Sequence, residues 1–371
     1  MRTVRPPWSR GKGSRRRRLY GFTARDVAAA LAMVAGGASY RETAEAIRVR
    51  AGRALSTAAR RTPSKMKGKK GKMLAPANRH PQLISDWVEV FAPIIWSAYA
   101  PTAWPGAVAI DEMQFRFGRP GKPRGDKAFS VIAAMGYDDS QHPYVAALEA
   151  VSSADIPAWR TLLGSLAGRP GWVVGDGGHP LRTAAALWSH VDVNLGEDPG
   201  FRTWRCEWHL AHNVRQALPI EITRDPTDRI NKLIDAAVRS TTGWQKLCDE
   251  LTKRSRRDGT CQGAMNVILN LRPVVLAQDG IEPHGPRSTG ALEEFFRQLE
   301  NTIGDRASRM TNKNRTDALL RLIAARRNGW LNETAWAELI RDQLARSHGR
   351  APDQRRHVDS RSAPSLRPSP R

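Results

Sequence analysis

The pattern of hydrophobic and polar positions divides the chain into a helical N-terminal part, a strand-rich middle and a mostly helical second half. From Thr23 the apolar residues recur at helical spacing until Gly36, where glycine ends the helix. Ser39 and Glu42 then form a capping-box pattern that begins a second short helix, and a third, basic helix is predicted over residues 53–61. The N-terminal part is therefore expected to be a small helical domain.

The middle of the chain predicts a mixed sheet, preceded by a helix whose apolar positions run from Leu83 to Ile95. Three apolar runs separated by turn residues predict an antiparallel meander, after which a helix, a strand and a second helix follow. The predicted strands cover residues 107–117, 127–137, 143–151 and 171–174, with helices from Asp155 and over 181–188, and a possible fifth strand at 201–205. This βββαβα order places the chain in the α/β class.

The second half predicts helices, with no clear strand over residues 210–285 and an amphipathic helix at 291–303. The expected division is a basic disordered arm (1–22), a helical domain (23–62), a basic linker (63–80), a catalytic core in two parts (81–209 and 286–345) separated by a helical insertion (210–285), and a disordered basic tail (346–371).

Charge changes the interpretation of the N-terminal helices. The chain carries 59 Lys and Arg against 36 Asp and Glu, a net charge of +23, of which +17 lies in residues 1–75 and +5 in residues 346–371. A nearly neutral body with basic ends indicates a nucleic-acid partner, and the short helices then predict a helix-turn-helix-like DNA-binding domain. The side chains expected to contact DNA are Arg15, Arg16, Arg17, Arg18, Arg48, Arg50, Arg53, Lys67, Lys69 and Lys70.

Cysteine usage and hydropathy bear on the compartment. Three widely spaced cysteines do not make a disulfide framework, and no apolar stretch reaches the roughly 18 residues that span a bilayer. The run Arg15 to Arg18 before an apolar segment resembles a twin-arginine export signal, but Arg25 and Asp26 interrupt the approach to that segment. We therefore expect a cytoplasmic protein, associated with a bacterial nucleoid and not with a membrane.

Three carboxylates carry the candidate chemistry. Asp111 follows the apolar run 107–110, Asp176 follows the run 172–174, and Glu293 lies at the edge of the apolar face of the later helix. Asp on the first and fourth strands of a βββαβα order is the ribonuclease-H-like arrangement, in which these strands are neighbours. Their carboxylates could hold two Mg²⁺ or Mn²⁺ ions that act on a phosphodiester.

Each carboxylate also has a structural interpretation, as a turn residue, a strand end or a solvated helix edge. Glu112 points to the opposite face of the strand from Asp111 and stays open as an alternative to it. Glu294 falls on the solvent side of its helix, whereas Glu300 occupies an edge similar to that of Glu293 and is the local alternative.

The order of these residues resembles a known family. Asp176 follows Asp111 after 65 residues, Cys206-Glu207-Trp208-His209 comes next, and Glu293 ends the series. This series resembles the DDE transposases of the Mutator-like group and related bacterial insertion sequences, over about residues 100–330. The approach to Glu293 is also similar, although Thr289 stands where Asn is common. The resemblance implies a ribonuclease-H-like core with a helical insertion, two metal ions and strand transfer at element ends, by a homo-oligomer on double-stranded DNA.

Cys206 and His209 invite a zinc interpretation, with Cys248 and Cys261 as further ligands. Structural zinc sites usually bring two close ligand pairs together, and only one close pair is present here. We therefore expect Cys206 and His209 to support the active site without holding a structural zinc ion.

Two other functions fit parts of the same pattern. Another ribonuclease-H-like nuclease, such as a resolvase, would share the carboxylates, but a terminal helix-turn-helix fits the recognition of element ends better. A non-catalytic DNA-binding regulator derived from a transposase would share the basic arm, but it would not need all three acids.

Overall fold

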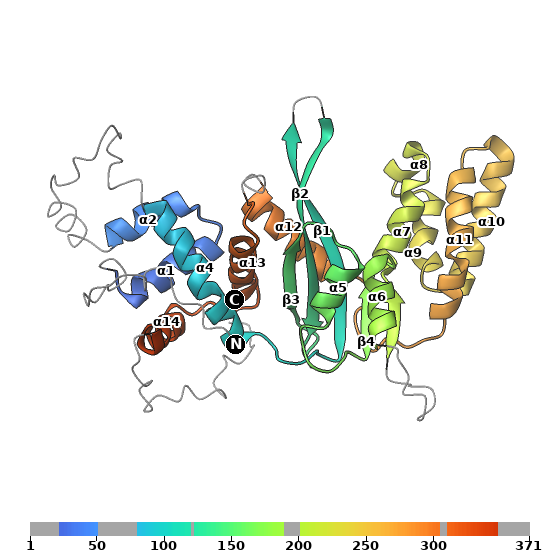
Figure 1. The fold of residues 1–371 in the computed structure, drawn as a ribbon. Helices are drawn as coiled ribbons and strands as arrows, with labels where there is room; N and C mark the ends of the chain where they lie inside the picture. Colours follow the sequence, from blue (N-terminus) through green and yellow to red (C-terminus); the bar gives the residue numbers. More distant parts are fainter. Residues whose placement is uncertain (1–21, 51–79, 120–121, 189–200, 305–309, 348–371) are drawn as a thin grey trace, which may run out of the picture. The chain divides into compact units, whose positions relative to one another are not determined.

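The computed structural model describes residues 22–50, 80–119, 122–188, 201–304 and 310–347 (Figure 1). Two compact units divide the described residues: 22–34, 38–50, 80–95 and 331–347 form the first, and 35–37, 96–119, 122–188, 201–304 and 310–330 form the second. Residues 81–95 and 331–345, which the sequence assigned to the catalytic core, therefore group with the N-terminal helices. The predicted helix at 53–61 and most of the arm, linker and tail lie outside the described residues.

The first unit contains α1 (Ala24–Ala35), α2 (Tyr40–Arg50), most of α4 (His80–Tyr99) and α14 (Glu333–Ser347). Reciprocal caps begin the first two helices: Thr23 and Asp26 exchange hydrogen bonds of 2.8 and 3.2 Å, and Ser39 and Glu42 do the same. The predicted helix starts are therefore confirmed. Of the expected DNA-contacting residues, Arg48 has an exposed side chain on α2, Arg50 is the last residue of that helix, and the others lie outside the described residues.

The second unit is built on a five-stranded mixed sheet of order β3-β2-β1-β4-β5, which confirms the α/β class. Its strands are β1 (Ala107–Arg119), β2 (Lys122–Tyr137), β3 (Pro143–Val151), β4 (Trp172–Gly175) and β5 (Arg202–Arg205). β1, β2 and β3 pair antiparallel, as the meander predicted, whereas β4 pairs parallel with both β1 and β5. The first and fourth strands are therefore neighbours.

Helices cover both faces of this sheet (Figure 1). α5 (Ile156–Leu163) and α6 (His179–Trp188) lie on one face, where they bury the side chains of Val108 and Ile110 in a cluster with Trp159 and Leu181. α12 (Gly290–Ile303) and α13 (Lys313–Arg327) contact the sheet through β1, β2 and β3. Because side chains alternate along a strand, Asp111 points away from the α5 and α6 cluster, toward the face that carries α12.

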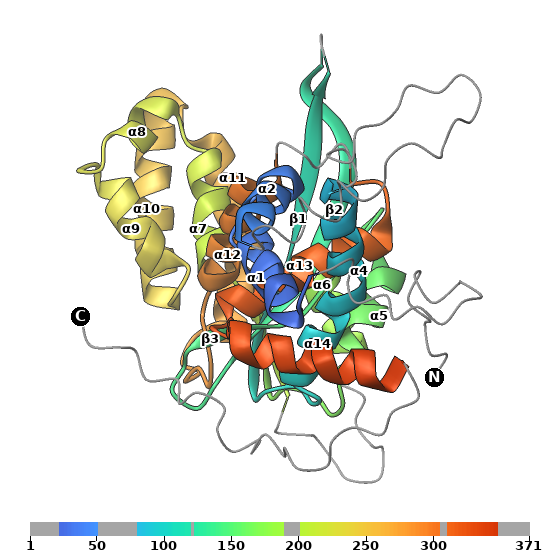
Figure 2. The ribbon, with the colours of Figure 1, turned by 90° about the vertical axis from the view of Figure 1, so that its left-hand side faces the viewer.

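The chain after β5 is helical, as predicted, although its first helix begins at Glu207 and not at residue 210 (Figure 2). We call this helical segment the insertion. It comprises α7 (Glu207–Gln216), α8 (Ile220–Arg224), α9 (Arg229–Ala237), α10 (Thr241–Asp258) and α11 (Gln262–Gln278). These helices bury a hydrophobic cluster of their own, in which Ile230, Leu247 and Ile268 are fully enclosed. Cys248 and Cys261 belong to this cluster, so packing accounts for both thiols. None of the described helices has the length and apolar content needed to cross a bilayer.

Candidate metal centre

The register of β1 and β4 brings the two aspartates to neighbouring positions. Ala109 pairs with Val174 in the parallel ladder, so two residues further along Asp111 and Asp176 stand beside each other. β4 ends at Gly175, whereas β1 continues to Arg119. Asp111 is therefore not the strand-end residue that its apolar run suggested. It lies inside a long strand, two residues beyond the last described pair with the neighbouring strand.

Asp111 is a buried carboxylate with one unsatisfied oxygen. Its side chain is only 7% exposed, and Oδ1 accepts a hydrogen bond of 2.8 Å from the backbone N–H of Glu112. Oδ2 is buried and has no hydrogen-bond partner among the described residues. Burial, with a smaller contribution from the negative charges of Glu293 and Asp176, raises the pKa of Asp111 to about 8 against the lowering effects of His209 and of the Glu112 N–H.

Glu293 reaches the same place from the first turn of α12. The helix buries the apolar face that the sequence predicted, consisting of Leu292, Phe295, Phe296, Leu299 and Ile303. Glu293 lies at the edge of that face with its side chain 41% exposed, whereas Glu294 turns to solvent and pairs with Arg297. Glu300 is also exposed, so Glu293 is the one of the three helix carboxylates that lies beside Asp111.

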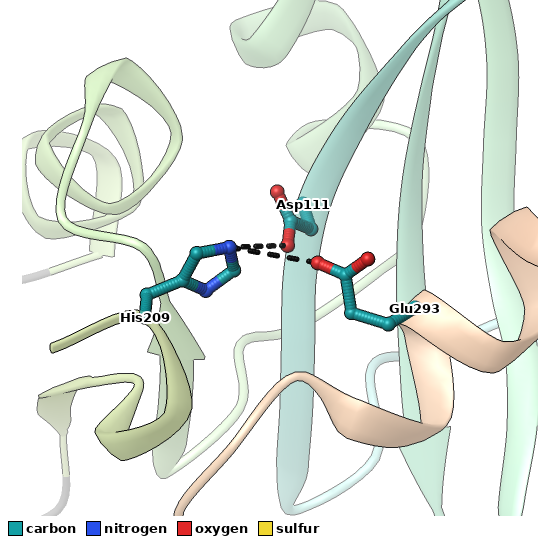
Figure 3. Close-up of side chains that lie close together, drawn as sticks. All are labelled: Asp111, His209 and Glu293. Atoms are coloured by element: carbon teal, nitrogen blue, oxygen red, sulfur yellow. Dashed lines mark ion pairs between the residues drawn. The ribbon is translucent and has the colours of Figure 1, made fainter. Parts of the chain in front are cut away.

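His209 completes the group from the insertion side. Its Nε2 lies 3.9 Å from Asp111 Oδ2 and 3.5 Å from Glu293 Oε1, and Figure 3 shows the imidazole directed at both carboxylates. One ligand atom from each residue lies within 4.8 Å of the others, so the group could hold a metal ion. The unsatisfied Oδ2 of Asp111 fits that role, because a buried carboxylate oxygen without a partner is costly unless a cation binds it.

Asp176 is close to this group without belonging to it. Its Oδ1 accepts a hydrogen bond of 2.6 Å from Gly178 N–H, which fixes the carboxylate in a turn, and its charge raises the pKa of Asp111. Gly177 adopts a φ of +84°, and a Cβ there would collide with Nε and Cδ of Arg205. The Arg205 side chain therefore passes directly over the turn that holds Asp176.

A buried network orients His209. Thr289 is fully buried at the start of α12, where its backbone N–H lies 3.3 Å from Cys206 Sγ and its Oγ1 lies 3.4 Å from the same sulfur. The Thr289 hydroxyl is also 3.5 Å from Nδ1 of His209. Burial raises the pKa of Cys206, but hydrogen bonds with His209 and Thr289 outweigh it and lower the pKa. In His209 burial lowers the pKa, and the bond to Cys206 and the nearby carboxylates raise it overall.

Glu207 joins the insertion to the segment before α12. It is 5% exposed, lies 2.8 Å from Nε of Arg239 and 3.6 Å from Nη1 of Arg287, and its backbone N–H donates to the Arg287 carbonyl at 3.0 Å. Local sequence patterns did not mark Glu207 or Arg205 as part of the site, and they gave no role to Thr289. The position of Glu207 inside the Cys206 to His209 motif could have drawn attention to it. Its contacts could not be predicted, because its two arginine partners are 32 and 80 residues away in the chain.

We expect the buried charge of Asp111 to make the metal-free protein less stable as pH rises. The folded pKa of about 8 lies above the value near 3.9 of an unfolded Asp, so between these values the folded state holds a proton that unfolding releases. Stability from this group is therefore lost as pH rises toward 8, by at most about 1.4 kcal/mol per pH unit. The raised pKa of His209 acts with the same sign.

The measurement is denaturant unfolding in EDTA at pH 5 to 8, for the wild type and for Asp111→Asn. The amide carries no charge, so its stability should fall less with pH and should exceed that of the wild type at pH 8. If the free energy of unfolding had the same pH dependence in the two proteins, the pKa of Asp111 would not be raised by burial.

Gly177→Ala should destabilise the protein by more than the cost of placing alanine at a positive φ. Alanine at positive φ costs about 1–2 kcal/mol, and here the added methyl group also collides with Arg205. Gly168→Ala is the matched control, because Gly168 has a φ of +70° and open space around its Cβ position. Urea unfolding should show a larger loss of stability for Gly177→Ala than for Gly168→Ala. Equal losses would contradict the close approach of Arg205.

Comparison of the sequence with protein-family models and with curated proteins finds no match. The functional interpretation therefore depends on the arrangement of Asp111, Asp176, His209 and Glu293, and on the charge of the chain.

Proposed function

We propose that the chain is a DDE transposase with a ribonuclease-H-like core, which binds the ends of a mobile element and transfers them to target DNA. The observation that carries the proposal is the meeting of Asp111 and Glu293 at a place where Asp176 begins the turn after the adjacent strand β4. The sheet order β3-β2-β1-β4-β5 and the helical insertion before α12 support it. These features agree with the resemblance in residue order.

Asp111, Asp176 and Glu293 would hold two Mg²⁺ or Mn²⁺ ions, which when bound supply an activated water and stabilise the leaving 3′ oxygen. The residues fit this role by position: Asp111 offers an unsatisfied oxygen, and Asp176 is held by Gly178 in the turn after the neighbouring strand. Glu293 is half-exposed, so it faces the side from which DNA can approach. The chain's task is to hold these carboxylates in fixed positions beside the phosphate.

The DNA partner follows from the distribution of charge. Residues 1–75 carry a net charge of +17, whereas residues 76–345 carry a net charge of only +1. We propose that α1 and α2 form part of a helix-turn-helix-like domain that recognises element ends, with the basic arm and linker on the phosphates. The protein would act as a homo-oligomer on double-stranded DNA at the bacterial nucleoid.

The test uses DNA from both flanks of the gene, where a transposase predicts inverted repeats, together with a labelled target duplex. With Mg²⁺ or Mn²⁺ the full-length protein should cut at the repeat ends, leave 3′-OH groups and join them to the target. Cleavage without joining would indicate a nuclease or resolvase instead. Binding without cleavage would indicate a regulator. Either result would overturn the transposase proposal, as would undiminished activity in EDTA.

A further inference from the structure

The candidate metal centre contains one nitrogen, Nε2 of His209, beside the carboxylate oxygens of Asp111 and Glu293. Nε2 of His209 lies nearer to Glu293 Oε1 than to Asp111 Oδ2, at 3.5 and 3.9 Å. Bonds of about 2.1 Å to a shared ion place adjacent ligands roughly 3 Å apart, so the two distances from Nε2 exceed that spacing by less than about 1 Å. Asp176, by contrast, is outside this group of three.

The surroundings of His209 prepare this nitrogen for binding. A metal-binding histidine usually donates its other ring N–H to a fixed acceptor, which sets both the tautomer and the ring orientation. Here Nδ1 faces the hydroxyl of Thr289 at 3.5 Å, and that hydroxyl and the Thr289 N–H both lie against Cys206 Sγ. With Nδ1–H donating to Thr289, the lone pair of Nε2 points at the two carboxylates (Figure 3).

We propose that His209 binds one of the two ions directly through Nε2, together with Asp111 and Glu293, and that this ligand makes the position selective for Mn²⁺ over Mg²⁺. Imidazole suits transition-metal ions, whereas Mg²⁺ prefers oxygen ligands and gives up its water reluctantly. Cys206 is outside the group whose ligand atoms lie within 4.8 Å of one another, and its sulfur contacts Thr289 instead. The proposal concerns the metal site of the proposed function, and it can be tested without DNA.

The probe is Mn²⁺ itself, added at one equivalent to the full-length, metal-free protein. Electron spin echo measurements should show coupling of the Mn²⁺ electron spin to a directly bound ¹⁴N nucleus. The coupling should disappear in His209→Gln and persist in His212→Gln. His212 lies on the same helix but is engaged elsewhere, since it stacks on Trp208 at 4.8 Å and contacts Gln216 at 2.7 Å.

Calorimetric titration gives a second measurement. His209→Gln should weaken Mn²⁺ binding by roughly tenfold or more and should change Mg²⁺ binding much less, so that the preference for Mn²⁺ is lost. Cys206→Ser keeps a polar atom beside Thr289 and should retain the ¹⁴N coupling. Circular dichroism melts of each variant show whether a missing signal reflects a missing ligand or an unfolded protein.

The outcomes separate this inference from the function on which it rests. A bound Mn²⁺ without ¹⁴N coupling in the wild type, or with the same coupling in His209→Gln, overturns the inference even if the protein joins DNA. Coupling that depends on His209 supports it even if no DNA is joined, in which case only the transposase proposal fails.

Discussion

Replacing Asp111, Asp176 or Glu293 by its amide should reduce DNA cleavage to the level seen without protein. Asp111→Asn, Asp176→Asn and Glu293→Gln keep the shape of each side chain but remove the negative charge that a divalent cation needs. DNA binding should remain largely intact, because the basic arm and linker lie far from these residues in the sequence. The measurement is cleavage of end-labelled DNA, with a mobility shift on the same duplex as the control for binding.

Glu294→Gln is the matched control for Glu293→Gln. It changes the next residue of the same helix, whose side chain is 54% exposed and pairs with Arg297 on the surface. Cleavage by this variant should equal that of the wild type. Full cleavage by Glu293→Gln, or equal losses in both variants, would contradict the assignment of the helix carboxylate.

Asp176→Asn gives the most discriminating result of the three. Asp111 and Glu293 lie together with His209, whereas Asp176 is the neighbour fixed by Gly178 outside that group. If Asp176→Asn cut DNA at the full rate, the centre formed by Asp111, His209 and Glu293 would suffice, and the three-carboxylate assignment would be wrong. Loss of cleavage with an intact Mn²⁺ site at His209 would instead assign Asp176 to a second ion.

Much of the sheet and the helix carboxylate could be predicted because local patterns determine them. β3 has the bounds that its apolar run predicted, and the buried face of α12 was clear from its helical spacing, which separated Glu293 from Glu294. The hydrophobic pattern predicted that β2 begins at residue 127, whereas the strand begins at Lys122. The charged residues that extend the hairpin show no apolar alternation, so the pattern did not predict that part of the strand. Cross-strand hydrogen bonds, which a hydrophobic pattern does not report, hold that extension.

The details of the site depend on contacts between residues that are distant in the chain. Thr289 meets Cys206 across 83 positions, and no local pattern marks that distance. The sequence placed His209 near the acids only through a resemblance in residue order, and it did not indicate which ring nitrogen faces them. The grouping of α14 with the N-terminal helices was missed for the same reason, since an amphipathic helix does not specify which partner covers its apolar face.

Removal of residues 1–21 should weaken binding to element ends and flatten its salt dependence. This segment holds eight basic residues and no acidic one. For each phosphate that the protein no longer neutralises, the slope of log K against log salt should fall by about 0.9. The truncation must stop before Phe22, because that ring packs on Trp87 with its centroid 5.2 Å away and is 5% exposed. A truncation that also removed α1 would expose Trp87 and confuse unfolding with weaker DNA binding.

The linker supplies an independent second variant, in which lysines 65, 67, 69, 70 and 72 become glutamine and no residue of the described helices changes. If the arm and the linker each track the phosphates, the two slope reductions should add, because counterion release is proportional to the number of neutralised phosphates. Removal of residues 348–371, which carry a net charge of +4, measures how much any basic segment contributes. A loss of affinity per removed charge that is the same for this tail as for the arm would mean non-specific attraction. A larger loss of affinity per removed charge for the arm and linker, seen only with repeat ends, would mean that these segments recognise the element. If the affinity and the salt slope of the arm and linker variants were unchanged, the nearly neutral body would hold the DNA instead.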